Sequence, residues 1–266
     1  MATPFLRWAG SKRQHVPFLR QWWSATEHKR YIEPFAGSAA LFFAIAPSRA
    51  VLGDLNGELI QAYQAVRDDP AAVHRRLIRF AKGRAAYERL RRTRRSHSAW
   101  QAARFIYLNR FCFNGLYRTN LEGEFNVPYG APKNYHLPDL DQLRASAGLL
   151  CQTRLMHADF RRVLSLIESG DFVYMDPPYA ISSRRMFIEY SSAHFSAKDL
   201  GELAVWLEEI DRRGASFIVS YADSSEARNL FRRWKRKRFT VRRNVAGFAG
   251  ARRNHYELFV SNIGAF

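Results

Sequence analysis

The segment from residue 31 to residue 56 constrains the fold most, because its hydrophobic pattern changes from strand to helix and back. YIEPF (31–35) is typical of a short strand, GSAALFFAIA (37–46) of a helix, and RAVLGDLN (49–56) of a second strand. Gly37 lies at the first turn, where a residue without Cβ lets the backbone approach a ligand closely. The segment therefore predicts a βαβ unit of the kind that binds nucleotide-type cofactors.

An acid ends the second of these strands. At that position the Asp54 carboxylate could accept hydrogen bonds from a ribose, or it could cap the next helix together with Asn56. Both roles can hold in neighbouring residues.

The alternation of strands and helices resumes late in the chain. Its predicted elements are strands at 151–160, 171–175 and 215–221, helices at 161–169, 197–213 and 224–234, and a closing strand pair at 238–245 and 255–262. Between the two parts, residues 58–110 have helical periodicity, and 109–134 has Gly, Asn and Pro turns around short aromatic runs, as in a β-hairpin or an extended loop. We therefore expect an α/β scaffold with a helical insertion.

The charge of the chain points to a polyanionic partner. Its 42 Lys and Arg against 24 Asp and Glu give a net charge of +18, which is typical of proteins that bind nucleic acid or an anionic membrane surface. Residues 75–95 contain ten basic residues and one acid, Glu88, and RRWKRKRFTVRR (232–243) has eight basic residues and no acid. Such runs are often solvated helix faces, but two of them favour nucleic acid.

Other features exclude several classes of protein. The longest apolar run, AALFFAIA (39–46), is far short of the roughly 18 residues of a membrane span, and the N-terminus lacks the apolar region of a signal peptide. The two cysteines, Cys112 and Cys151, form no CxxC motif. We expect free thiols, no metal, no membrane association and a cytoplasmic location.

The stretch YMDPPY (174–179) places an acid, two prolines and an aromatic ring directly after a strand. Two prolines end the strand and stiffen the loop. Asp176 and the Pro177 carbonyl could accept hydrogen bonds from an exocyclic amino group of a base, which would free the nitrogen lone pair for attack. Tyr179 could stack on that base after it is flipped out of a duplex. The alternative is a strand end with a packed tyrosine.

These segments resemble the successive motifs of the Dam-type DNA adenine methyltransferases. The resemblance rests on FLRWAGSK (5–12), YIEPFAGSAALFF (31–43), LGDLN (52–56), NRFCFNGLYRTN with GEFNVPYG (109–130), and DFVYMDPPY (171–179), in the order of that family. It implies a Rossmann-like catalytic domain of residues 1–56 and 148–266 that binds S-adenosylmethionine without a metal. It also implies an inserted DNA target-recognition domain of residues 57–147.

The resemblance assigns three groups of residues. The catalytic group is Asp176, Pro177, Pro178 and Tyr179, and the cofactor group is Trp8, Lys12, Phe35, Ala36, Gly37, Asp54, Asp159, Phe160 and Asp176. The group expected to face DNA is Arg7, Phe113, Asn114, Leu116, Arg118 and Pro128. Arg118 is the candidate for bidentate reading of a guanine, and Phe113 could wedge into the base stack; Phe113 and Leu116 could instead only pack the hairpin.

Three positions depart from the family pattern. Ser11 replaces a glycine in the WAGGK motif, and Ala39 replaces the second glycine of the cofactor motif, so we expect a tighter pocket. Arg7 stands where a lysine is common, which puts the recognition of GATC in question because arginine and lysine read a base edge differently.

The expected activity is methyl transfer to the N6 amino group of adenine in a short duplex site, GATC or a related sequence. The alternatives are methyl transfer to the N4 amino group of cytosine, methyl transfer to adenine in RNA, and a catalytically silent nucleic-acid-binding protein. We also expect a bacterial or phage-like protein that is monomeric and located at the nucleoid. A cognate restriction endonuclease is a potential partner. The recognised site and the biological role, whether restriction protection, regulation or mobile-element defence, stay open.

Overall fold

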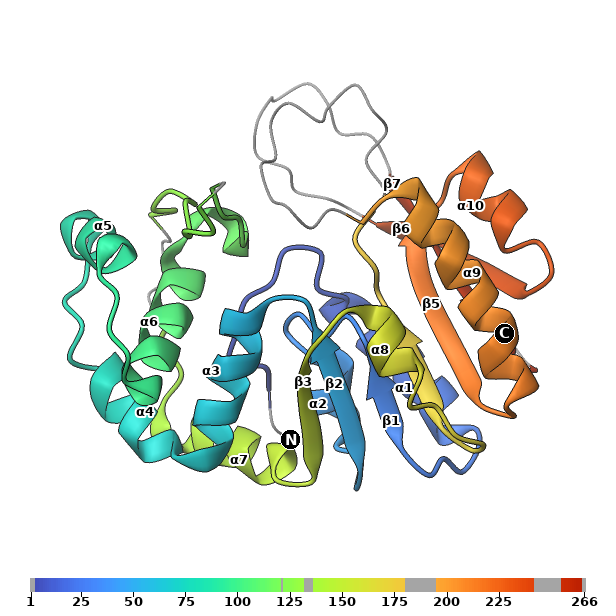
Figure 1. Cartoon of the computed structure of the whole chain (residues 1–266), viewed down its shortest axis with the longest axis horizontal. Coiled ribbons are helices and arrows are strands. Elements are labelled where there is room, and N and C mark those ends of the chain that lie inside the picture. Colours follow the sequence, from blue (N-terminus) through green and yellow to red (C-terminus); the bar gives the residue numbers. More distant parts are fainter. Residues whose placement is uncertain (1–2, 121, 132–135, 180–194, 242–254, 265–266) are drawn as a thin grey trace.

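The computed structural model of the chain describes residues 3–120, 122–131, 136–179, 195–241 and 255–264. Within these residues a seven-stranded sheet forms the centre of the molecule (Figure 1). The strands are β1 (Tyr31–Glu33), β2 (Ala50–Asp54), β3 (Thr153–His157), β4 (Phe172–Met175), β5 (Ser216–Ala222), β6 (Lys235–Val241) and β7 (His255–Ser261). The short helices η1 (Arg13–His15) and α1 (Val16–Ser24) precede the sheet in the chain.

The order of the strands is β3-β2-β1-β4-β5-β7-β6. The first five are parallel to their neighbours, whereas β7 runs antiparallel to both β5 and β6. The direction of chain progression across the sheet reverses between β1 and β4. In open α/β sheets such a reversal leaves a crevice at the carboxyl ends of the strands, where ligands bind.

Helices cover both faces of the sheet, so its strands are buried on both sides (Figure 1). Tyr31 and Leu52 pack on one face, with α1 and with α2 (Ala40–Ile45). Their neighbours Ile32 and Val51 pack on the other face, because successive side chains of a strand alternate. That face is covered by α8 (Phe160–Leu164), α9 (Ala197–Arg212) and α10 (Ser225–Leu230).

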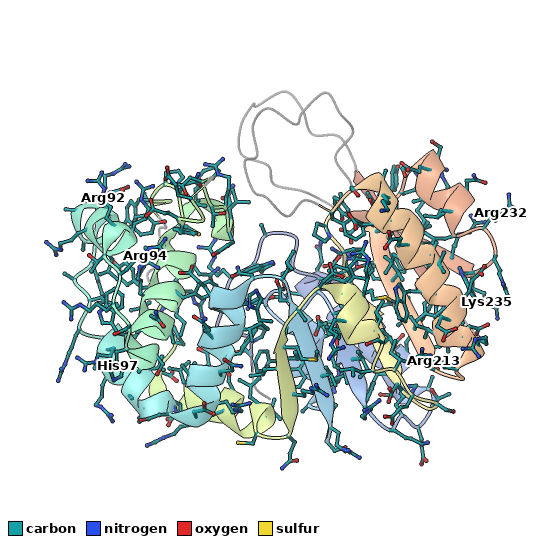
Figure 2. All side chains as sticks on the ribbon, in the orientation of Figure 1. Arg92, Arg94, His97, Arg213, Arg232 and Lys235 are labelled. Carbon is teal, nitrogen blue, oxygen red and sulfur yellow. The ribbon has the colours of Figure 1, made fainter. Side chains whose placement is uncertain are left out.

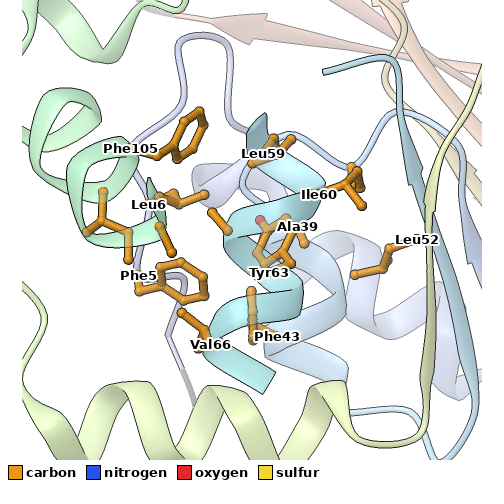
Figure 3. Packing of buried hydrophobic residues seen from close by; sticks show 14 of the residues in the cluster. Phe5, Leu6, Ala39, Phe43, Leu52, Leu59, Ile60, Tyr63, Val66 and Phe105 are labelled. Atoms are coloured by element: carbon orange, nitrogen blue, oxygen red, sulfur yellow. The ribbon is translucent and has the colours of Figure 1, made fainter. Parts of the chain in front are cut away.

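A helical part lies beside the β3 edge of the sheet (Figure 1). Its helices are α3 (Gly57–Asp68), α4 (Pro70–Leu77), α5 (Arg84–Arg92), α6 (Ser98–Phe111) and α7 (Leu140–Leu150). Helix α3 connects this part to the sheet through one hydrophobic core. Leu59, Ile60 and Tyr63 of α3 belong to the same core as Leu52 of β2 and Phe105 of α6 (Figure 3). The expected mixture of an α/β sheet and a mainly helical insertion is confirmed.

The turn segment of the insertion has less regular structure than a hairpin of two strands. After the short helix η2 (Phe113–Gly115), its two sides meet through isolated antiparallel bridges, Cys112 with Tyr129 and Thr119 with Phe125. The expected β-hairpin is therefore reduced to bridges in the described residues. Gly, Asn and Pro occur too often here for a continuous ladder.

Most of the expected elements occur close to their predicted places. The strand expected from 238 begins earlier, at Lys235, and residues 242–245 of that expectation lie outside the described residues. The helix α1, which begins with a proline at one of its first two positions, was not predicted.

Candidate active site and DNA interface

The residues assigned to the cofactor and to catalysis come together at the carboxyl edge of the sheet. Gly37 follows β1, Asp54 ends β2, Asp159 follows β3 and Asp176 follows β4, and these four strands are parallel neighbours. Their carboxyl ends therefore lie side by side. The N-terminal loop that carries Lys12 reaches the same edge, at the reversal between β1 and β4.

Asp176 is held by two donors from distant parts of the chain. Lys12 Nζ lies 2.8 Å from Asp176 Oδ1 and 3.0 Å from Oδ2, and Ser220 Oγ donates to Oδ1 at 2.8 Å. The backbone of β5 fixes Ser220. A carboxylate has about four acceptor positions, so among the described residues one position, on Oδ2, is left for a further donor.

Lys12 is almost fully enclosed. Its side chain is 6% exposed and its ammonium has three acceptors, Gly10 O at 3.0 Å, Asp176, and Glu257 Oε1 at 3.4 Å. Burial acts against the charged form, yet the carboxylates of Asp176 and Glu257 raise the pKa of Lys12 well above its usual range. The ammonium is therefore charged at neutral pH.

Tyr179 is fixed at both ends of its side chain. Its hydroxyl donates to Glu257 Oε1 at 3.0 Å, and its ring meets the ring of Tyr221 edge to face, with centroids 5.4 Å apart. Pro177 is buried and Pro178 exposed. The loop thus has the rigidity expected for a preorganised site.

The Gly37 turn is built around Asp54. Asp54 accepts hydrogen bonds from the amide groups of Gly37 and Asn56, each at 2.9 Å, and burial raises its pKa. Asn56 caps α3 through Leu59 N at 3.1 Å, so the cap belongs to Asn56. Gly37 itself lies against Trp8, and a Cβ added to it would be 2.9 Å from the indole ring.

Gly37→Ala is expected to lower the free energy of unfolding by about 1–2 kcal/mol, because Gly37 has φ +47° and no room for Cβ. If Trp8 contacts S-adenosylmethionine, as the family resemblance implies, its displacement should also weaken binding of that cofactor roughly tenfold. Urea unfolding and calorimetric titration measure the two effects. Gly201→Ala in α9 is the matched control: nothing lies within 4 Å of its added Cβ, and it should stabilise slightly. Equal behaviour of the two variants would contradict the expectation.

The two departures from the glycine pattern lie close to this turn. Ser11 Oγ and Ser38 Oγ are 3.1 Å apart and share a hydrogen bond. Ala39 has φ +49° and ψ +41°, a conformation that favours glycine, and its fully buried methyl group packs in the core shown in Figure 3. The tighter pocket stays a prediction.

Asp159 and Phe160 follow β3. Asp159 caps α8 by accepting from Arg161 N at 2.9 Å, and its carboxylate also pairs with the Arg161 guanidinium at 3.0 Å. The ring of Phe160 stacks on Phe35 with centroids 5.3 Å apart, and Phe195 approaches both rings. Phe195, which the motifs did not indicate, extends this aromatic group.

Glu33, the last residue of β1, is 3% exposed and accepts from Tyr31 OH at 3.0 Å. Burial raises its pKa well above the usual range. When the pKa of an acid is higher in the folded state than in the unfolded state, the acid contributes stability at pH values below its unfolded-state pKa. This stability is lost as the pH rises from the unfolded-state pKa towards the folded-state pKa.

Glu33→Gln should therefore match the wild type in stability below the ordinary glutamate pKa of about 4.3 and be the more stable protein at pH 8. Urea unfolding across this range measures the difference, with the exposed Glu226→Gln as control. A difference that does not change with pH would contradict the charge argument.

The residues assigned to DNA meet the N-terminal loop. Asn109 of α6 accepts from Arg7 N at 2.8 Å, and Ala9 N donates to Gly115 O at 3.2 Å. Trp8 stacks on Tyr117, with ring centroids 6.1 Å apart. One short loop therefore contacts both the carboxyl edge of the sheet and the turn segment of the insertion, residues 112–130.

Within that segment the assigned side chains are open to solvent to different extents. Phe113 and Leu116 are 39% and 40% exposed, and Asn114 and Pro128 are exposed as well. Arg118 is partly buried, and its Nε donates to Asn126 Oδ1 at 2.8 Å. Exposed large apolar groups in a turn favour a contact surface over packing of the segment alone.

The two basic clusters lie at opposite ends of the molecule (Figure 2). Arg92 and Arg94 are exposed in the helical part, and Arg232 and Lys235 are exposed at the β6 edge. At β6 several cations have protein partners: Arg238 pairs with Asp223, Arg233 with Glu208, and Arg236 with a backbone carbonyl group. Lysine and arginine on an edge strand also block pairing with other chains. Residues 242 and 243 lie outside the described residues.

No helix among the described residues is long and apolar enough to cross a membrane.

The mostly parallel seven-stranded sheet with helices on both faces is consistent with a Rossmann-like methyltransferase fold. The chain belongs to the family of D12 class N6 adenine-specific DNA methyltransferases, whose sequence model matches residues 8–245. The resemblance to Dam-type enzymes and the expected enzyme class are confirmed at this level.

Its relatives cover nearly the whole chain. A type II methyltransferase, M1.LlaDCHI of Lactococcus lactis subsp. cremoris, is 32% identical over 98% of this chain and 95% of its own length. The retron Ec67 DNA adenine methylase of Escherichia coli is 32% identical over 96% and 90%. The DNA adenine methylase of Escherichia coli K12 is 29% identical over 96% and 93%.

Sequence reasoning missed several residues of the site: Phe195 beside Phe35 and Phe160, Ser220 and Glu257, and also His15, whose Nε2 lies 3.4 Å from Glu257 Oε2. Ser220 lies inside β5 and Glu257 inside β7, in runs that look like ordinary buried strands. A polar residue within such a run was the one available signal, since buried polar groups need partners.

Proposed function

We propose that this protein transfers a methyl group from S-adenosylmethionine to the N6 amino group of an adenine flipped out of a short duplex DNA site, GATC or a related sequence. The arrangement around Asp176 carries the proposal. A carboxylate with one acceptor position left, rigidly held beside a fixed tyrosine, suits an exocyclic amino group.

The residues at the strand ends suit the cofactor. Asp54 and Asp159 offer carboxylates for hydroxyl groups, and the partly exposed Phe35 ring, backed by the stacked Phe160 ring, offers an apolar surface for an adenine. Trp8, Lys12, Ala36 and Gly37 complete the proposed pocket. The cofactor supplies an activated methyl group on a sulfonium. No metal is required for this chemistry, because the leaving group is already activated.

The chain's own residues orient the amino group. Asp176 Oδ2 and the Pro177 carbonyl accept its two N–H bonds, which draws the nitrogen lone pair out of the ring. Tyr179 stacks on the flipped base. On transfer, the amino nitrogen would bond to the methyl group, the cofactor would leave as a neutral thioether, and the nitrogen would give up one proton to solvent. Lys12 and Ser220 keep the Asp176 carboxylate in place throughout.

The recognition segment is proposed to hold the duplex. Its exposed apolar residues, Phe113 and Leu116, are placed to fill the gap left by a flipped base. Arg118 and Arg7 are the candidates for base edges, with Asn114 and Pro128 beside them. The exposed arginines of α4 and α5 suit the phosphate backbone. The protein is proposed to act as a monomer, and the type II name of one relative makes a partner endonuclease a reasonable expectation.

Nucleoside mass spectrometry of DNA incubated with the protein and methyl-labelled cofactor tests the proposal. Label in N6-methyladenine of duplex DNA is the expected result. Label in methylcytosine, or label only in RNA, would overturn the substrate assignment. Binding of DNA without any label would instead support a silent binding protein. Duplexes with and without GATC then separate the site from related sequences.

A further inference from the structure

Glu257 is a buried carboxylate that connects two parts of the candidate active site. It lies on β7 opposite Ala222 of β5 and Phe239 of β6 and is 3% exposed. Its Oε1 accepts from Tyr179 OH at 3.0 Å and lies 3.4 Å from Lys12 Nζ. Its Oε2 lies 3.4 Å from His15 Nε2. A buried acid is costly unless it has such partners.

We infer that Glu257 is a positioning residue for methyl transfer: it anchors the hydroxyl of Tyr179 and shares the Lys12 ammonium with Asp176. The inference rests on the proposed function and adds a residue that contacts neither the base nor the methyl group.

The first part of the argument concerns Lys12. Its ammonium donates to Gly10 O and to both oxygens of Asp176, and it forms an ion pair with Glu257 Oε1 at 3.4 Å. If Glu257 loses its charge, the ammonium has a single carboxylate partner. Its charge then acts on Asp176 alone, whose Oδ2 it already contacts at 3.0 Å, and this makes Oδ2 a weaker acceptor for the amino group. Loss of the charge at Glu257 should therefore slow transfer even though Asp176 is intact.

The second part concerns Tyr179. The tyrosine ring packs edge to face with Tyr221 and is held at its far end by Glu257. A ring anchored at both places keeps one orientation, which a stacking partner for a flipped base requires. Without the anchor the ring can rotate, and fewer bound bases are correctly oriented.

Titratable groups from several elements face Glu257. Among them are Lys12 from the N-terminal loop, His15 from η1, Tyr174 from β4, Tyr179 from the loop after β4, and Asp176 beyond Lys12. Burial lowers the pKa of His15, so Lys12 is the cation of this group at neutral pH. Glu257→Gln therefore changes the charge balance at Lys12.

The test compares Glu257→Gln, Tyr179→Phe and the double variant under single-turnover conditions. Each single variant should transfer methyl groups roughly 10–100-fold more slowly, with KM for the cofactor within about threefold of the wild type. Both remove the same contact at Tyr179, so the double variant should lose less than the product of the two single losses. Glu208→Gln is the control: this glutamate is exposed and pairs with Arg233, and wild-type rates are expected.

The outcomes separate the two proposals. A wild type that does not methylate adenine would refute the proposed function and this inference with it. An active wild type with an equally active Glu257→Gln variant would refute the inference alone. So would a loss that lies wholly in KM or in thermal stability, or losses that simply multiply in the double variant. If Glu257→Gln does not fold, Tyr179→Phe still decides whether the anchoring contact matters for the rate.

Discussion

Asp176→Asn is expected to lower the rate of methyl transfer at least about 10³-fold while duplex DNA affinity stays within about threefold of the wild type. Asparagine keeps the shape of the side chain but carries no charge and presents N–H donors where Lys12 and Ser220 now donate. The amino group of the base then meets no carboxylate. DNA affinity should persist, because the exposed arginines of α4 and α5 lie elsewhere.

Single-turnover transfer of labelled methyl groups and fluorescence anisotropy with a labelled duplex measure the two quantities. Asp141→Asn is the matched control, since its carboxylate is 94% exposed and forms only a surface pair at 3.8 Å. An Asp176→Asn variant that keeps a tenth of the wild-type rate of methyl transfer would show that Asp176 does not have the proposed role. A parallel loss of DNA affinity would place Asp176 in binding instead.

Lys12→Met is expected to destabilise the protein by roughly 3 kcal/mol and to abolish transfer. Methionine fills the space of the lysine stem but leaves the carboxylates of Asp176 and Glu257 facing each other without the cation between them. Removing one member of a buried charged group leaves an uncompensated charge. The partial exposure of Asp176 keeps the loss at the lower end of the usual range.

Urea unfolding measures this loss. Lys198→Met, whose amine is exposed and pairs with Glu202 along a helix, should change the free energy of unfolding by less than about 0.5 kcal/mol. The combination Lys12→Met with Glu257→Gln should be more stable than Lys12→Met alone, because one of the two facing carboxylates is neutralised. A combination that is less stable would contradict the charge explanation.

Much of the fold and part of the site could be predicted from short stretches of sequence. The βαβ unit of residues 31–56 could be predicted because the strand and helix periods, the glycine turn and the terminal acid are local features of the sequence. The loop after β4 could be predicted for the same reason, since two adjacent prolines end a strand whatever its position in the sheet. The hairpin was predicted less well, because its pairing depends on bridges between residues such as Cys112 and Tyr129.

The sequence by itself determined the alternation of elements, the basic insertion and the rigid acid and tyrosine of residues 174–179. Only the tertiary structure decided what surrounds that acid. Lys12, Ser220 and Glu257 come from a loop and two strands far apart in the chain, and they meet because β5 and β7 pair beside β4 at the carboxyl edge of the sheet. Strand order is a long-range property with no local period, so a buried serine or glutamate in a strand gives no sign of its partner until the sheet is assembled.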